Sequence, residues 1–144
     1  MSKKILVVDD DFSQRELYRD VFNSAGFDVT VADDGQDAWE KIQHDKPDLV
    51  FSGILMPRMT GFELIDKIRS NPSTVTIPII IFSHLGKPED RKKAGELSVR
   101  FMVKGFDGPI DILKTVRDIL IPVEIQYSSK IEPEDDDRPA AIML

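Results

Sequence analysis

The sequence predicts a doubly wound α/β domain, in which helices cover both faces of a parallel sheet. Apolar runs that suit strands buried on both faces recur along the chain. Stretches with helical spacing lie between them, and strict alternation of the two implies right-handed crossovers. The length of 144 residues, 41% of them hydrophobic, fits one compact domain.

Five segments are predicted to be strands. Near-continuous apolar runs at residues 5–8, 49–51 and 77–82 are typical of central strands. Residues 29–32 and 101–103 are shorter or more mixed, which favours positions nearer the sheet edges.

Five helices are predicted between and after these strands. Ser13 and Thr60 are candidate N-caps, and Pro88 and Pro109 stand where a first helical turn would begin. The apolar positions with helical spacing are Leu17, Val21 and Phe22, then Ala38, Trp39 and Ile42, then Phe62, Ile65 and Ile68, and finally Ile112, Leu113, Val116, Ile119 and Leu120.

The composition excludes several function classes. A formal net charge of −7 disfavours sequence-independent attraction to nucleic acid or anionic lipid. The chain has no cysteine, and its two histidines, His44 and His84, are too few for a His-rich zinc centre. The apolar stretch at residues 5–8, which three aspartates follow, is far too short for a signal peptide or membrane span, so we expect a cytoplasmic protein without nucleic-acid or membrane partners.

The composition shifts after Leu120, which divides the chain into a domain at residues 1–120 and an acidic C-terminal extension at 121–144. The extension holds six acidic residues against two basic ones and so carries −4 of the net charge. Two interpretations stay open. The segment is a solvated tail, or Val123, Ile125 and Tyr127 form a half-buried strand.

Polar residues follow the predicted strands where each strand ends. Residues 9–11 are three aspartates, and Ser52-Gly53, Ser83-His84 and Lys104-Gly105 follow later strands. In an open parallel sheet, ligands bind beyond the carboxyl ends of the strands. Clustered carboxylates there can hold Mg²⁺, and a hydroxyl with an ammonium can hold a phosphoryl group.

The order and spacing of five motifs over residues 3–120 resemble response-regulator receiver domains. The motifs are ILVVDDD at 5–11, PDLVFSGILMP at 47–57, TGFEL at 60–64, PIIIFS at 78–83 and FMVKGF at 101–106. The resemblance implies a flavodoxin-like five-stranded parallel sheet of order 2-1-3-4-5. It also implies two-component, or phosphorelay, signal transduction.

The resemblance assigns roles to single residues. Asp9 and Asp10 become the acids of a metal site, with the backbone carbonyl of Leu55 as a further ligand. Ser83 becomes the hydroxyl that binds the phosphoryl group, and Phe101 the aromatic switch residue. Lys104 becomes the ammonium that contacts the phosphoryl group.

The phospho-accepting aspartate is missing, because its position, four residues before Pro57, is Gly53. Ser52 should face the opposite side of the strand. Phosphorylation of Asp9 or Asp10 would take a ligand from the metal site. We therefore expect impaired phosphorylation and, with one carboxylate fewer, weak Mg²⁺ binding at best.

Two further departures flank the same site. His84 follows the hydroxyl where receivers carry a small residue, and Gly105 follows the lysine where they carry a cis proline. Because cis peptides are essentially confined to proline, the Lys104-Gly105 bond should be trans. Three departures at one site favour an inherited loss of phosphotransfer.

Three alternatives stay open. In the first, the aspartates form no site but only a solvated strand end, with Lys104 as counter-ion. An ordinary receiver with a substituted acceptor predicts that its gene encodes Asp at position 53. A small Mg-dependent haloacid-dehalogenase-type phosphatase would use the motif Asp9-x-Asp11-x-Ser13, with Ser83, Lys104, Asp107 and Asp111 as later elements. Its motifs are too closely spaced after Lys104, and no segment is long enough for a cap domain.

The favoured function is that of a binding module and not of an enzyme. The domain would act through contacts with a signalling protein, namely a histidine kinase, effector or regulator. The resemblance places the contact face at the fourth helix, fifth strand and fifth helix, from about Pro88 to Leu120. A homodimer through this face or through the C-terminal extension is the second expectation.

Overall fold

The computed structural model describes residues 2–84 and 87–121, in which five strands and five helices alternate. The strands are β1 (Lys4–Val8), β2 (Asp28–Ala32), β3 (Leu49–Ser52), β4 (Ile79–Ser83) and β5 (Arg100–Val103). The helices are α1 (Phe12–Ser24), α2 (Gly35–His44), α3 (Gly61–Ser70), α4 (Pro88–Glu96) and α5 (Pro109–Leu120). None of these helices has the length and apolarity that crossing a membrane requires. The extension predicted at 121–144 lies, apart from Ile121, outside the described residues.

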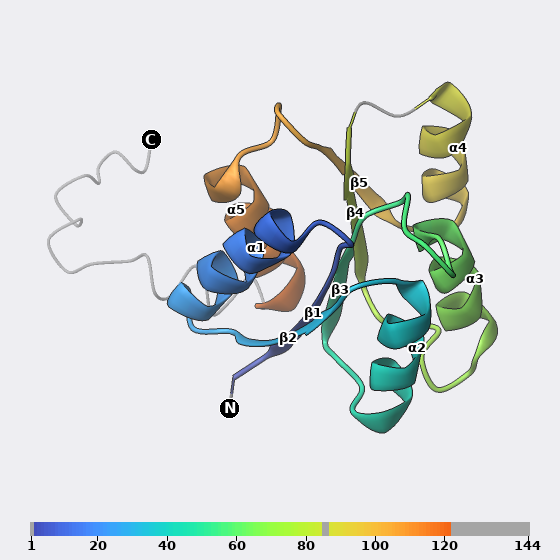
Figure 1. The fold of residues 1–144 in the computed structure, drawn as a ribbon, viewed down its shortest axis with the longest axis horizontal. Coiled ribbons are helices and arrows are strands. Elements are labelled where there is room, and N and C mark those ends of the chain that lie inside the picture. Colours follow the sequence, from blue (N-terminus) through green and yellow to red (C-terminus); the bar gives the residue numbers. More distant parts are fainter. Residues whose placement is uncertain (1, 85–86, 122–144) are drawn as a thin grey trace, which may run out of the picture.

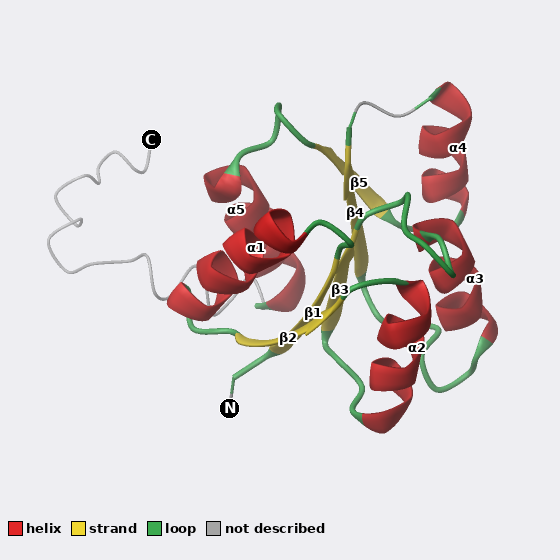
Figure 2. Cartoon of the chain, viewed as in Figure 1, coloured by secondary structure: helices red, strands yellow, loops and turns green. Residues whose placement is uncertain are grey.

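All five strands are parallel and lie in the order β2-β1-β3-β4-β5, which confirms the predicted sheet. Figure 1 shows α1 and α5 on one face of the sheet and α2, α3 and α4 on the other. The strands stand between the two helical layers when the chain is coloured by secondary structure (Figure 2). This arrangement puts every strand's carboxyl end at the same edge of the sheet.

The two faces of the sheet are covered by different kinds of apolar side chain. The α1/α5 face contains an aromatic cluster in which the Tyr18 ring lies 5.1 Å from Phe51 and 5.2 Å from Phe82, centroid to centroid. The α2/α3/α4 face is mainly aliphatic, with Leu6 and Val50 among its buried residues. Residues on each strand alternate between these clusters, as the period of two requires.

Three details of the predicted elements are wrong. The N-cap of α1 is Asp11 and not Ser13, because the Asp11 carboxylate accepts hydrogen bonds from the amides of Ser13 and Gln14. Leu17 is 47% exposed, and its neighbour Tyr18 enters the core instead. Strand β4 begins at Ile79, because the amide of Ile77 closes a turn onto Thr74.

A charged side chain binds a backbone group on each outer strand of the sheet. At β2, Lys41 donates a hydrogen bond of 2.5 Å to the carbonyl of Val31. At β5, the carboxylate of Asp107 accepts a hydrogen bond of 2.7 Å from the amide of Val103. The carbonyl of Val103 is also bonded, to the amides of Phe106 and Asp107. Both outer strands therefore end next to a side chain that covers part of their free edge.

Candidate functional site

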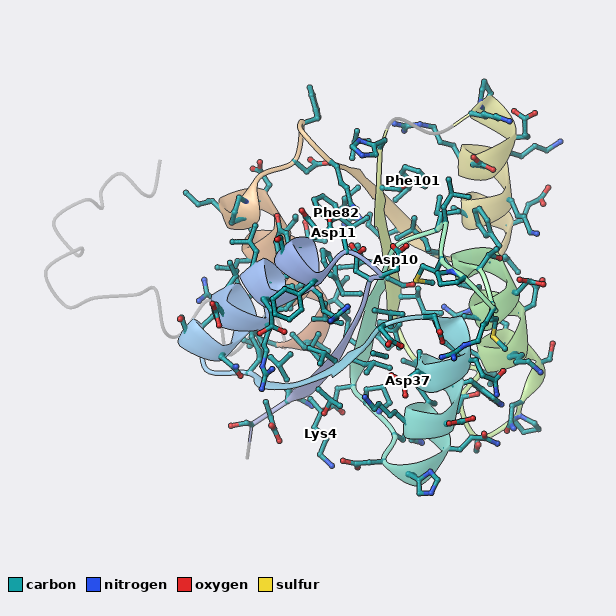
Figure 3. The ribbon with its side chains drawn as sticks, in the orientation of Figure 1. Lys4, Asp10, Asp11, Asp37, Phe82 and Phe101 are labelled. Carbon is teal, nitrogen blue, oxygen red and sulfur yellow. The ribbon has the colours of Figure 1, made fainter. Side chains whose placement is uncertain are left out.

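The polar residues predicted to form a site follow four strands and meet at one edge of the sheet. Backbone hydrogen bonds continue the strand pairing beyond the strands, from Gly53 to Val8 (2.9 Å) and from Lys104 to Ser83 (2.7 Å). Asp10 and Asp11 lie at this end of the sheet in Figure 3. The structure therefore brings these strand ends together.

Asp9 is the buried acid of the site, with 7% of its surface exposed. One carboxylate oxygen accepts a hydrogen bond of 2.9 Å from the amide of Asp11, and the other lies 3.3 Å from the ammonium of Lys104. The same ammonium stands 5.9 Å above the ring centroid of Phe82. Lys104 is thus the counter-ion of Asp9, which is buried and does not stand at a solvated strand end.

The other two aspartates have different roles. The carboxylate of Asp11 is engaged as the N-cap of α1. Asp10 is exposed and forms no ion pair with a residue that the structure describes. The three consecutive aspartates therefore do not converge on one point.

Gly53 lies beside Asp9 with room for a side chain. A Cβ atom there would stand 3.9 Å from the Asp9 carboxylate, an ordinary contact, and the backbone does not have a positive φ. Neither conformation nor close packing at the Cβ position requires glycine. Ser52, by contrast, is buried and donates a hydrogen bond to the carbonyl of Gly53, so its hydroxyl does not point into the site.

A glycine is required one loop later, at Gly61. A Cβ atom there would lie 2.2 Å from the carbonyl oxygen of Gly53, because the start of α3 packs directly on the end of β3. The amide of Gly61 also donates to the carbonyl of Ile54 at 2.8 Å. The loop from Gly53 to Gly61 is thereby closed at its base.

The residues present only partly fit a divalent cation. Mg²⁺ favours several oxygen ligands, and carboxylates supply the charge. One carboxylate oxygen of Asp9 already accepts a hydrogen bond from the Asp11 amide, and the other lies near the Lys104 ammonium. Gly53 supplies no carboxylate. Over residues 2–84 and 87–121, no group of three His, Cys, Asp or Glu side chains is placed to hold a metal. Asp9, Asp10 and the Leu55 carbonyl would be the ligands, one carboxylate short.

The remaining predicted site residues surround this centre. Ser83 is half-buried at the end of β4, and His84 is exposed. Phe101 is half-buried against the aliphatic core, with the guanidinium of Arg91 5.1 Å from its ring centroid. The Lys104-Gly105 peptide is trans as predicted, and Gly105 has φ +83°, a conformation that favours glycine.

An ion pair that holds the loop between β3 and α3 is not predicted by any pattern in the sequence. Arg58, at a positive φ of 66°, forms an ion pair with the buried carboxylate of Asp34, which also caps α2. The carbonyl of Met59 accepts the amide of Gly35 at 3.1 Å. Only the capping role could have been found, since Asp34 directly precedes a helical pattern.

Exposed apolar side chains gather around the site. Six large hydrophobic side chains are exposed among the residues that the structure describes. Five of them lie in or near the loops and helix starts at the carboxyl ends of the strands. We call these five the apolar rim: Phe12, Leu17, Leu55, Phe106 and Ile110. Phe106 and Ile110 are each 83% exposed. Such a concentration of apolar surface is typical of an interaction site.

Comparisons with known proteins agree with this geometry. The family model described as "Response regulator receiver domain" matches residues 5–117. The chain is 36% identical over 117 residues to an uncharacterized 14.6 kDa protein of Leptolyngbya boryana, covering 78% of this chain and 84% of that one. It is 31% identical to the alkaline phosphatase synthesis regulatory protein PhoP of Bacillus subtilis, covering 59% of that protein.

Other relatives are much longer, and the chain spans only 15% of the gliding motility regulatory protein of Myxococcus xanthus. Among solved structures, the chemotaxis protein CheY4 of Vibrio cholerae is 31% identical with a TM-score of 0.77, over 83% of this chain and all of that one. A putative response regulator from Chloroflexus aurantiacus gives a TM-score of 0.78 at 28% identity, over 85% of this chain and all of that one. Because the family model matches well over half of the sequence and the sheet has the expected order, the chain belongs to the response regulator receiver domain family.

Proposed function

We propose that this receiver domain signals through protein contacts without being phosphorylated at the end of β3. The observation that carries the proposal is Gly53, which stands beside Asp9 and has no carboxylate to form an acyl phosphate. Asp9, the nearest buried acid, is paired with Lys104 at 3.3 Å. Phosphorylating Asp9 would break this pair inside a largely buried environment.

The apolar rim supports an output through contacts. Its members belong to the starts of α1 and α5 and to the loops that follow β3 and β5, so a partner could reach the site and the rim together. A signalling protein, either a histidine kinase or an effector, is the partner class that receiver membership favours. Burial of such side chains stabilises a complex by about 25 cal/mol per Å² of apolar surface removed from water.

The face formed by α4, β5 and α5 remains a second candidate surface for a partner or a homodimer. Helix α4 buries only Ala94 among its nine residues, and its basic residues Arg91, Lys92 and Lys93 are exposed. This face is therefore more charged than the apolar rim. The C-terminal extension is the third candidate for dimerisation and lies almost wholly outside the described residues.

The phosphatase alternative finds less support in the geometry. Its motif would need Asp11 as a free acid, yet the Asp11 carboxylate caps α1. Its later acid Asp107 accepts the amide of Val103 at 2.7 Å and is engaged at the sheet edge. A binding role uses both residues as the structure has them.

Incubation with acetyl phosphate or phosphoramidate and Mg²⁺, followed by intact-mass measurement, tests the proposal. We expect no gain of a phosphoryl mass, because no carboxylate stands at the acceptor position. A stable adduct that maps to Asp9 or Asp10 would contradict it. A gene that encodes Asp at position 53 would show instead that the domain is an ordinary receiver with a substituted acceptor.

A further inference from the structure

A cleft lies between the first half of α1 and the loop that joins β5 to α5. Its volume is about 560 Å³, within the usual range for small-molecule sites. Apolar surface comes from Leu17, Phe82, Phe106 and Pro109, and Tyr18 lies among them. Lys104 and Gly105 form part of the same wall, so the cleft adjoins the candidate site without using Gly53.

Tyr18 brings an unused hydrogen-bonding group to this cleft. The residue is 3% exposed, and its ring packs in the aromatic cluster with Phe51 and Phe82. Its hydroxyl forms no hydrogen bond to any residue that the structure describes. No fully buried side-chain oxygen in that part of the chain lacks a partner, so this hydroxyl reaches the surface of the cleft.

The hydroxyl is a donor at neutral pH. Burial and, to a smaller extent, the negative charge of Asp107 raise the pKa of the Tyr18 phenol, which therefore stays protonated. Because the hydroxyl reaches the cleft and bonds to no residue that the structure describes, it can donate a hydrogen bond to an acceptor atom of a bound molecule. The cleft therefore favours a molecule with a hydrogen-bond acceptor.

The charges around the cleft favour an uncharged ligand. Asp11 and Asp107 both lie on its wall and would repel an anion. The ammonium of Lys104 is held by Asp9 at 3.3 Å and is not free to balance one. Both carboxylates are already bonded to backbone amides, so neither is free to pair with a cation.

We propose that this cleft binds a small, uncharged aromatic molecule, whose ring packs against Leu17 and Phe106 and whose acceptor atom receives the hydrogen bond of the Tyr18 hydroxyl. The bound ring touches the loop that carries Lys104 and Gly105. Occupation of the cleft thereby gives a receiver domain without an acceptor a second means of control. The role of the cleft as a means of control rests on the proposed function. The binding itself does not, because it does not depend on phosphorylation.

Nuclear magnetic resonance titration of the full chain, labelled with ¹⁵N, tests the binding with three ring compounds. Benzamide is uncharged and carries a carbonyl acceptor, benzoate has nearly the same shape with a negative charge, and toluene has no acceptor. We expect benzamide to shift the amide signals of residues 105–108 in a saturable way. Benzoate should bind several-fold more weakly, because Asp11 and Asp107 oppose its charge.

Two variants separate the hydrogen bond from the packing. Tyr18→Phe keeps the ring and removes the hydroxyl, so benzamide affinity should fall by about two- to tenfold while toluene affinity stays the same. Phe106→Ala, at a position 83% exposed, should weaken both compounds without endangering the fold. Leu55→Ala, at an exposed apolar residue outside the cleft, is the matched control and should change neither.

Each contrary result overturns the proposal. An absence of saturable shifts excludes the site, and an equal benzamide affinity in Tyr18→Phe excludes the role of the hydroxyl. Shifts confined to the separate pocket beside α2, around Lys4, Thr30 and His44, would place the ligand elsewhere. A phosphoryl adduct would overturn the proposed function and leave these titrations unaffected.

Discussion

Three glycines near the site illustrate how a single residue's role depends on its local geometry. Gly105 has a positive φ. At Gly61, a Cβ atom would lie only 2.2 Å from a carbonyl oxygen. Gly53 has neither constraint, since a Cβ atom there would make only ordinary contacts at 3.9 Å. The first two glycines are explained by the fold, whereas nothing in the backbone explains the third.

The ordinary contacts of a Cβ atom at Gly53 predict that Gly53→Asp is tolerated and strengthens Mg²⁺ binding. The new carboxylate would stand beside Asp9 and complete a three-acid oxygen site with Asp10. Calorimetric titration with Mg²⁺ should show tighter binding than in the parent chain. Gly53→Asn, of nearly the same shape without the charge, is the control and should bind less tightly than the aspartate.

Stronger Mg²⁺ binding in Gly53→Asp need not restore phosphorylation. His84 is exposed next to Ser83, where it can obstruct entry of the phosphoryl group. The double variant Gly53→Asp with His84→Ala is therefore the better test for adduct formation by intact mass. An Mg²⁺ affinity unchanged by Gly53→Asp would show that the metal site is placed wrongly.

At the scale of elements, α3 begins with a capping box that makes its stability depend on pH. The Thr60 hydroxyl accepts the amide of Glu63 at 3.2 Å, and the Glu63 carboxylate accepts the amide of Thr60 at 2.8 Å. The hydrogen bond from the Thr60 amide, followed by the interaction with the Thr60 hydroxyl, lowers the pKa of Glu63 below its ordinary value of 4.5. Because the folded pKa is the lower one, this contribution is present above pH 4.5 and is lost as the pH falls through the folded value.

Glu63→Gln should therefore destabilise the domain at pH 7 and have a smaller effect at pH 3. Urea unfolding of both proteins at the two pH values gives the comparison. Thr60→Ala should cost about 1 kcal/mol at pH 7, whereas Thr60→Ser keeps the hydroxyl and should cost less. An effect of Glu63→Gln that is equal at both pH values would contradict the role of the ionised carboxylate.

The sequence was most informative at this scale. Near-continuous apolar runs predict the three central strands, which are buried on both faces, and shorter, more mixed segments predict the two outer strands. The sequence predicts Thr60 as the cap of α3 correctly, whereas the cap of α1 is Asp11 and not the predicted Ser13. Both residues match the capping pattern, and only the backbone geometry shows which amides meet which side chain. Helix ends are for this reason harder to predict than helices.

At the scale of the whole molecule, strand order follows from the family resemblance, and the meeting of the strand ends then follows from the order. The partner of Asp9 could be named as Lys104, although the two are 95 residues apart. Two features are not predicted from the sequence: the ion pair between Arg58 and Asp34, and the cleft beside Tyr18. Both arise where separate loops or helices pack together, and no local pattern in the sequence records such contacts.

The C-terminal extension carries a prediction about assembly. If Val123, Ile125 and Tyr127 form an apolar stripe, that stripe must be buried, and a second chain can provide the surface. Light scattering of the full chain should then show a dimer, and truncation after Ile121 should lower the apparent mass. Ile121 is retained because it packs on the core and its amide donates to Arg117 at 2.9 Å.

A monomeric full chain at high concentration would contradict this prediction. The truncated chain should remain folded, as its circular dichroism would show, because residues 2–84 and 87–121 include all five strands and five helices. The stripe itself lies outside these residues and stays a prediction. Loss of folding on truncation would mean that the extension stabilises its own domain.

The hydrogen bonds that Lys41 and Asp107 make at the two sheet edges bear on how this protein behaves in concentrated solution. Open strand edges are templates on which further chains add, and repeated addition leads to fibrils. A neighbouring molecule that extended this sheet at Val31 or Val103 would first have to displace a charged group from the backbone. The displaced group would lose that hydrogen bond in an interface that excludes water, although Lys41 would keep its ion pair with Asp37. We therefore expect crowded copies of the domain to meet through side-chain contacts and not by extending the sheet.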